Sequence, residues 1–321
     1  MTSALVRFIA FIAASLLLLT PDSTLELTAL ARHQAASYGQ SVSSVPEGVI
    51  LVKGASPSAS DSFTPLPEDA RIEGNLFDDP YFQMSFRLPN GWVEKYKGPP
   101  PSESGRYVLA ELTPSDSSAT RPGGSILITA EDMFFAPVPI ATARDVVNYA
   151  KDHLREDYRI EHPPEGLQLG GRRFSTLGYG SPSAQLHWRV LATQVRCHTI
   201  EIVLVSRDAR FIESTVLELE KMKLPSEESA GPFPVCIRDF VRGGNLLRRV
   251  DPVLTEHRFN SIPVRVIIDR NGSIRHVHFL SAFPDQAKAI ADALAHWKFK
   301  PYLLNGQPVE IETGILFGGP R

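Results

Sequence analysis

The stretch from residue 262 to residue 317 constrains the fold of this chain more than any other part. Over Val264–Ile268, β-branched residues recur with a period of two, which predicts a β-strand. Asn271-Gly272 follows, and this dipeptide is a strong hairpin signal because both residues tolerate a positive φ. A second strand is predicted over Ser273–Leu280. Its apolar residues fall on both faces, which indicates either a bulge or burial on both sides.

A helix and a last strand complete this stretch. The helix is predicted to begin at Pro284-Asp285, since proline is tolerated where no backbone N–H bond is needed. The residues on its apolar face are Ala287, Ile290, Ala291, Leu294 and Trp297. After the turn signal Asn305-Gly306, a final strand is predicted over Val309–Leu316. The order β-β-α-β predicts a small α+β unit with its helix packed on one face of the sheet.

Several short blocks of this region resemble the C-terminal domain of the TonB family of periplasmic energy transducers. They are a D-x-N-G turn at Asp269–Gly272, an alanine-rich helix, a W-x-F-x-P block at Trp297–Pro301 and an N-G-x-P-V block at Asn305–Val309. The resemblance covers residues 251–318 and supports the fold more than the identity of a partner.

The resemblance also implies a way of binding. In the TonB family an extended receptor segment is captured at the sheet edge of this domain, by β-strand addition in which main-chain groups give affinity. The residues expected to form this edge are Val309, Glu310, Ile311, Glu312, Thr313 and Ile315. Glu310 and Glu312 are equally well explained as edge charges that prevent uncontrolled pairing. The implied partners are an outer-membrane receptor segment and, for an anchored chain, an inner-membrane motor complex.

The N-terminus has the pattern of a targeting segment. Arg7 precedes the run Phe8–Leu19, in which only Ser15 is polar. A membrane-spanning helix needs about 20 apolar residues, whereas the apolar region of a signal peptide needs about 7–15. Ala29-Leu30-Ala31 resembles a cleavage site. Residues 1–31 are therefore interpreted as a signal peptide for export to a bacterial periplasm, and an uncleaved inner-membrane anchor is the alternative.

Residues 32–76 are rich in Ser, Ala, Pro and Gly and are predicted to be a disordered linker, because they offer too little apolar surface to bury. The formal net charge is −3 and no basic block occurs, so nucleic acid is not expected as a partner.

Residues 77–225 predict a second domain, joined by a connecting segment, 226–250, to the C-terminal domain, 251–321. Helices are expected over Ala141–Arg155 and after Asp208, an N-cap residue. The predicted strands are Tyr81–Phe86, Tyr107–Leu112, Ile126–Ala130, Arg173–Tyr179, Leu186–Thr193 and Thr199–Val205. This pattern predicts an α+β sandwich with a mostly antiparallel sheet.

The same region resembles the PsbP-like sandwich. The blocks that carry the resemblance are Leu88–Trp92, the helix at 141–155, Gly170–Phe174, and the closing pair of the 197–206 strand and the 209–222 helix. The resemblance implies a binding or scaffolding domain without chemistry of its own.

Catalytic motifs are not found in the sequence, which contains no H-E-x-x-H, P-loop, G-x-S-x-G or G-x-G-x-x-G. His276 and His278 share one strand face and could bind a metal, but an exposed strand face explains them better. Cys197-His198 has the residue types of a nucleophile and its base, but adjacent strand residues point to opposite faces. We therefore expect no enzyme activity, no cofactor and no metal.

The two cysteines are more informative as a pair. In an oxidising compartment Cys197 and Cys236 could form a disulfide between the sandwich domain and the connecting segment. The alternative is two separately buried thiols. Trp92, Trp188 and Trp297 are expected in the core, because each lies in or beside a predicted element.

Taken together, these features predict a non-enzymatic exported protein of the cell envelope that binds a protein partner by edge-strand addition. The TonB resemblance links this role to energy-dependent outer-membrane transport. The alternative is a soluble periplasmic ligand-binding or assembly factor that acts through the PsbP-like domain.

Overall fold

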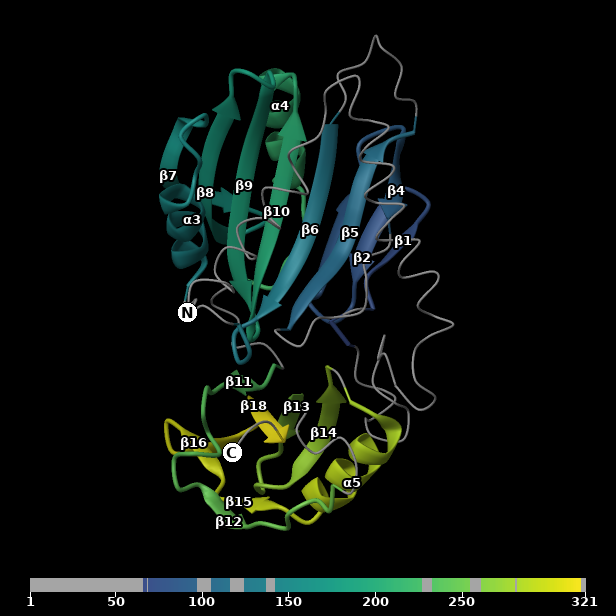
Figure 1. Cartoon of the computed structure of the whole chain (residues 1–321), viewed down its shortest axis with the longest axis vertical. Coiled ribbons are helices and arrows are strands. Elements are labelled where there is room, and N and C mark those ends of the chain that lie inside the picture. Colours follow the sequence, from purple (N-terminus) through teal and green to yellow (C-terminus); the bar gives the residue numbers. More distant parts are fainter. Residues whose placement is uncertain are drawn as a thin grey trace.

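The computed structural model describes residues 66–67, 69–96, 105–115, 124–136, 142–226, 233–254, 261–280 and 282–318. These residues form an N-terminal unit, 66–226, and a C-terminal unit, 233–318, each with its own sheet and core (Figure 1). The predicted signal peptide and most of the predicted linker lie outside the described residues. No helix among the described residues is long and apolar enough to cross a membrane.

The N-terminal unit is built on a seven-stranded antiparallel sheet with the order β4-β5-β6-β10-β9-β8-β7. Its strands are β4 (Trp92–Tyr96), β5 (Arg106–Pro114), β6 (Gly124–Asp132), β7 (Arg159–Leu169), β8 (Arg172–Ser181), β9 (Leu186–Val195) and β10 (His198–Ser206). The strands predicted in this sheet are all present. Edge strand β7 was not predicted, because it is polar and carries Pro163-Pro164, which breaks the alternation.

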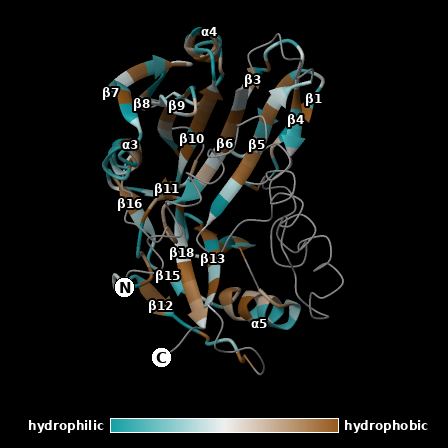
Figure 2. Cartoon of the chain, turned by 45° about the horizontal axis from the view of Figure 1, so that its top comes forward, coloured by the Kyte–Doolittle hydropathy of each residue, from teal (hydrophilic) through white to brown (hydrophobic). Residues whose placement is uncertain are grey.

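Helix α3 (Ala143–Asp152) covers one face of this sheet, and α4 (Ala209–Leu219) lies on the other. The predicted cap of α4 is confirmed, since the side chain of Asp208 accepts from the backbone N–H of Arg210 at 2.9 Å. Hydrophobic residues predominate along β6 and β10, whereas α3 is largely hydrophilic (Figure 2).

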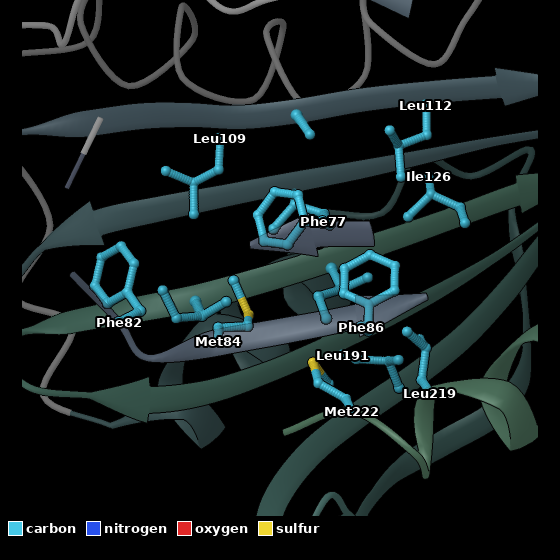
Figure 3. Close-up of a cluster of buried hydrophobic side chains, with 14 of the residues drawn as sticks. Phe77, Phe82, Met84, Phe86, Leu109, Leu112, Ile126, Leu191, Leu219 and Met222 are labelled. Carbon is cyan, nitrogen blue, oxygen red and sulfur yellow. The ribbon is translucent and has the colours of Figure 1, made fainter. Parts of the chain in front are cut away.

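A three-stranded sheet shares the α4 face. It consists of β1 (Arg71–Glu73), β2 (Leu76–Asp79) and β3 (Met84–Arg87). Figure 3 shows Phe77 and Phe86 of this sheet packed toward Leu112 and Ile126 of the large one. The linker predicted over 32–76 therefore ends too late, because Arg71–Glu73 already pairs with β2.

The C-terminal unit has a four-stranded sheet with the order β11-β18-β13-β14. Its elements are β11 (Val235–Cys236), β12 (Leu246–Arg248), β13 (Ser261–Ile268), β14 (Ile274–Phe279), α5 (Pro284–Leu294), β15 (Lys298–Phe299), β16 (Tyr302–Leu304), β17 (Gln307–Val309) and β18 (Ile311–Gly318). The predicted β-β-α-β order is present as β13, β14, α5 and β18. Phe240 and β11 also belong to this unit, so much of the segment 226–250 is part of the C-terminal fold and not a connector.

The two faces of the C-terminal sheet differ in chemistry. Val264, Val266 and Ile268 pack with α5 and Trp297 in an apolar core. The alternate residues of β13 point the other way, toward the N-terminal unit. We call this second face the ionic face, and its residues are Arg265, Ile267, His276, His278 and Glu312. The sequence predicted either a bulge or burial on both sides for the second strand of this hairpin. Both are present, since the two faces are buried and the pairing register shifts after Ile267.

The two units together have a sheet-rich α+β fold, as the sequence predicted. Trp92, Trp188 and Trp297 are buried, as expected of core residues.

Candidate functional site at the interface between the two units

The predicted edge strand lies inside the sheet. Strand β18 pairs with β13 on one side and, over Ile311–Glu312, with β11 on the other. The carbonyl oxygens of Glu310 and Glu312 accept hydrogen bonds from the backbone N–H groups of Val235 and Ile237 at 2.8 and 3.0 Å. The edge prediction is therefore wrong for this part of β18. The reason is that β11 comes from the segment that the sequence suggested was only a connector.

The six residues expected to form the edge lie in different surroundings. Ile311, Thr313 and Ile315 are buried, and Val309 ends β17 in a separate hairpin with β16. Glu310 pairs with Arg275 at 3.4 Å. Glu312 is 2% exposed and so does not act as a solvated edge charge.

Beyond β11, the outward side of β18 has no strand partner among the described residues. Successive residues of a strand direct their backbone groups to opposite sides. Since the Glu310 and Glu312 carbonyls point toward β11, the groups of Gly314, Leu316 and Gly318 point the same way. We call the backbone of these three residues the outer edge of β18. The Leu316 side chain is 59% exposed.

A buried cluster of charges joins the ionic face to the N-terminal unit. Its centre is Arg265, whose Nε lies 2.9 Å from the Asp132 carboxylate at the end of β6. The other arm of the guanidinium donates to the Glu312 carboxylate and to the hydroxyl of Tyr81. The Tyr81 hydroxyl also contacts Glu312 at 2.9 Å. The fork of an arginine suits this arrangement because its donors are fixed in one plane.

Arg196 adds a second cation from the turn between β9 and β10. Its guanidinium lies 3.5 Å from Oε2 of Glu312, the carboxylate oxygen that Arg265 does not contact. The guanidinium donates to the backbone carbonyl of Tyr81 at 3.2 Å. It also lies 3.8 Å from the centre of the Tyr81 ring, in cation–π contact. Two arginines therefore face two carboxylates, so the buried charges balance.

His198 is fully buried beside the cluster. Its Nε2 lies 3.7 Å from the Asp132 carboxylate, and its ring packs edge-on against Tyr81, Phe82 and Tyr107. Burial, and then the charge of Arg265, lower the pKa of His198 well below its ordinary value, so this imidazole is neutral. Burial raises the pKa of Asp132 to about 6, which Arg265 and the backbone N–H of Phe134 oppose.

Packing at the interface is close. A Cβ atom on Gly314 would lie 2.5 Å from the Cβ of Phe134, so glycine allows the loop after β6 to rest on β18. A small pocket beside the cluster is lined by Tyr81, Arg265, His276 and His278, and its volume is about 10 Å³. It has room for about one water molecule.

The sequence predicted that the histidines of β14 lie on an exposed strand face, and this prediction is wrong. His276 and His278 are 5% and 1% exposed and belong to the ionic face, where β14 meets the N-terminal unit. Within the described residues, no group of three or more His, Cys, Asp or Glu side chains could hold a metal ion.

The two cysteines meet at the interface. Both are free thiols, Cys197 buried and Cys236 half-buried, and burial and then the neighbouring Cys236 raise the pKa of Cys197 well above its ordinary value. Cys236 is thus the thiol nearest in chemistry to Cys197, whereas His198 lies among aromatic rings. No disulfide joins them here, and the sequence-based suggestion of a Cys197–Cys236 bond stays a prediction.

The residues missed from the sequence are Tyr81, Asp132, Arg196 and Arg265. Arg265 did carry a signal, since a charged residue interrupts an otherwise apolar strand whose neighbours are buried. Its partners carried none, because Tyr81 is 184 residues away in the chain.

No protein-family profile matches the sequence, and no curated protein matches it. Among solved structures, the chain is similar to cyanobacterial PsbP (CyanoP) from Synechocystis sp. PCC 6803, at 19% identity over 53% of this chain and 100% of that chain, with a TM-score of 0.33. It is also similar to LpqN of Mycobacterium tuberculosis, described as involved in cell envelope biogenesis, at 12% identity over 44% of this chain and 84% of that chain, with a TM-score of 0.29.

Proposed function

We propose that this protein is a non-catalytic, exported protein of the bacterial envelope that binds a protein partner by strand addition at the outer edge of β18. The site is shifted from the one expected from the sequence and begins where β11 ends. A link to energy-dependent outer-membrane transport rests on the TonB resemblance of the C-terminal unit.

The observation that supports the proposal is the pairing of β11 with β18. This two-residue strand has already been added to the sheet in parallel, through hydrogen bonds to Glu310 and Glu312. The edge of β18 therefore accepts a strand, and its outward backbone groups continue past β11. A partner strand would extend the same ladder over Gly314, Leu316 and Gly318.

The composition of this edge supports the same role. Natural sheets protect free edges with charges, prolines or bulges. The segment Gly314–Gly318 reads Gly-Ile-Leu-Phe-Gly and has none of these charged or proline residues. By contrast β7, one of the two edge strands of the large sheet, carries Pro163-Pro164 and several charged residues. The outer edge of β18 lacks the protection that β7 has.

Leu316→Pro tests the site with little disturbance of the fold. The N–H of Leu316 points outward, so proline removes a donor that β13 does not use, and proline is tolerated at strand edges. Leu316→Ala is the matched control, because it removes the same side chain and keeps the donor. Each full-length chain is chemically cross-linked in intact envelopes and recovered with an antibody against the chain.

We expect the wild type and Leu316→Ala to give the same cross-linked partner, and Leu316→Pro to reduce it at least about tenfold, as loss of an edge hydrogen bond and a steric block would. Equal recovery of that partner with all three chains would exclude strand addition at β18. It would favour the second candidate, a binding or assembly factor that acts through the N-terminal unit.

A further inference from the structure

Cys197 lies in the tight turn that joins β9 to β10. The preceding residue, Arg196, has a φ of 53°, and the turn directs the Cys197 side chain into the interface, where it is fully buried. The carbonyl of Cys197 accepts from the backbone N–H of Met133 at 2.9 Å. The loop after β6 and the β9–β10 turn therefore form one connected surface on the N-terminal unit.

Cys236 is the second residue of β11 and is half-buried. Its Cα is paired with that of Glu312, the acceptor of the charge cluster. Two contacts with the N-terminal unit flank β11. Arg196 reaches Glu312 of the neighbouring β18, and Arg238, two residues after Cys236, donates to the backbone carbonyl of Met133. Charged contacts on both sides thus hold the segment around Cys236 beside the β9–β10 turn that carries Cys197.

We propose that Cys197 and Cys236 form a disulfide that fastens β11, and with it the C-terminal unit, to the N-terminal unit. The two cysteines come from different units, and their neighbours meet at the interface, because Arg196 beside Cys197 reaches Glu312, whose Cα is paired with that of Cys236. Since β11 occupies part of the β18 edge, the bond also prevents β11 from leaving that edge. This inference does not rest on the proposed function, because the bond can form with or without a binding partner.

The oxidation requires an electron acceptor, and the acceptor class is a protein or small-molecule disulfide. Cys236 is the accessible thiol. Its thiolate attacks one sulfur of the acceptor, giving a mixed disulfide and releasing the first acceptor thiol. Cys197 then loses its proton and attacks the Cys236 sulfur, which forms the Cys197–Cys236 bond and releases the second acceptor thiol. Burial raises the pKa of the Cys197 thiol and keeps it protonated, so the first attack falls to Cys236, and Cys197 reacts only once the mixed disulfide is held beside it.

The bond would close a long loop of chain and so restrict the unfolded state. Reduction of a bond of this kind is expected to lower the Tm by roughly 5–10 °C in a chain of this size. The same reduction should leave the Tm of a Cys236→Ala chain unchanged. Cys236 is half-buried, so its replacement by alanine leaves the core of either unit intact.

The test uses the full chain, purified without reductant and treated with glutathione disulfide. We expect its intact mass to be lower than that of the reduced chain by two hydrogen atoms. We also expect no alkylation by iodoacetamide after denaturation, and a cross-linked peptide pair containing Cys197 and Cys236. Two alkylated cysteines, a glutathione adduct retained on Cys236, or a bond between two chains would each overturn the proposal. Any of these results would leave the outer edge of β18 to be judged by the Leu316 variants alone.

Discussion

Arg265 lies with its guanidinium group between two carboxylates, Asp132 of the N-terminal unit and Glu312 of the C-terminal unit. All three side chains are buried. Burying charges is costly unless they are paired and hydrogen-bonded, so the cluster fixes the orientation of the units more than it adds stability. Removal of one charged residue from the cluster leaves the others buried without a partner, and this lowers the free energy of unfolding.

Arg265→Met should therefore lower the free energy of unfolding by roughly 3–5 kcal/mol, because two buried carboxylates lose their shared partner. Adding Glu312→Gln to this variant should recover part of the loss. Lys221→Met is the control, since Lys221 pairs with Glu218 on the exposed surface and should cost less than about 1 kcal/mol. Urea denaturation measures all of these changes. Equal losses for Arg265→Met and Lys221→Met would show that the cluster is not buried.

Asp79 makes a second prediction at the residue scale. It is fully buried, and one of its oxygens accepts from the backbone N–H groups of Tyr81 and Phe82, at 3.0 Å each. Burial raises the pKa of Asp79 to about 7, against the effect of those two hydrogen bonds. The folded state then binds the proton more tightly than the unfolded state, whose pKa is about 3.9.

The contribution of Asp79 to the free energy of unfolding is thus largest below about pH 4, and it falls as the pH rises toward 7, by a few kcal/mol. Asp79→Asn should remove this fall and stabilise the protein at pH 8, because the amide oxygen keeps both hydrogen bonds without a buried charge. Urea midpoints at pH 5 and pH 8 test it, with Asp78→Asn as the neighbouring control. An unchanged pH dependence in Asp79→Asn would contradict the prediction.

Two Asn-Gly turns of the C-terminal unit give a matched comparison at the scale of elements. Gly272 and Gly306 have φ values of +81° and +80°, a conformation that costs any other residue about 1 kcal/mol. A Cβ on Gly272 would lie 2.0 Å from the carbonyl oxygen of Phe299, whereas a Cβ on Gly306 would meet no atom within 4 Å.

Gly306→Ala should therefore cost about 1 kcal/mol, and Gly272→Ala clearly more, roughly 2–4 kcal/mol, because β15 must also move. Thermal or urea unfolding of the two variants measures the difference. Equal costs would mean that the β13–β14 turn does not pack against β15.

Elements with a strong local pattern could be predicted from the sequence. The alternation over Val264–Ile268 and the Asp208 cap gave β13 and α4. Strand β11 could not be predicted, because it is two residues long and its pairing with β18 depends on the tertiary fold. Because β11 was not predicted, the expected binding edge included Glu310 and Glu312, whose backbone carbonyls already accept hydrogen bonds from the β11 segment.

At the scale of the whole molecule, the C-terminal sheet has an apolar face against α5 and an ionic face against the N-terminal unit. Sequence patterns identified the apolar face. They could not identify the ionic face as an interface. In an antiparallel sheet with one face on the core, the residues that point to the other face are expected to be exposed to solvent. It is buried because Asp132 and Tyr81 lie against Arg265 and Arg196 lies against Glu312.

This arrangement also sets how the units can move. An interface built on paired, buried charges is specific in geometry. Oxidation of Cys197 and Cys236 would hold it closed, and loss of Arg265 would weaken it. The outer edge of β18 is formed within the C-terminal unit, so its backbone groups are available in either case.

A double-mutant cycle across the interface tests the central structural claim most directly. The cycle combines Asp132→Asn with Arg265→Met and measures the free energy of unfolding of all four chains. Because the two side chains are 2.9 Å apart and buried, the coupling energy should be at least about 1.5 kcal/mol. Additivity within about 0.5 kcal/mol would mean that these residues do not meet, and that the ionic face of the C-terminal sheet does not bind the N-terminal unit.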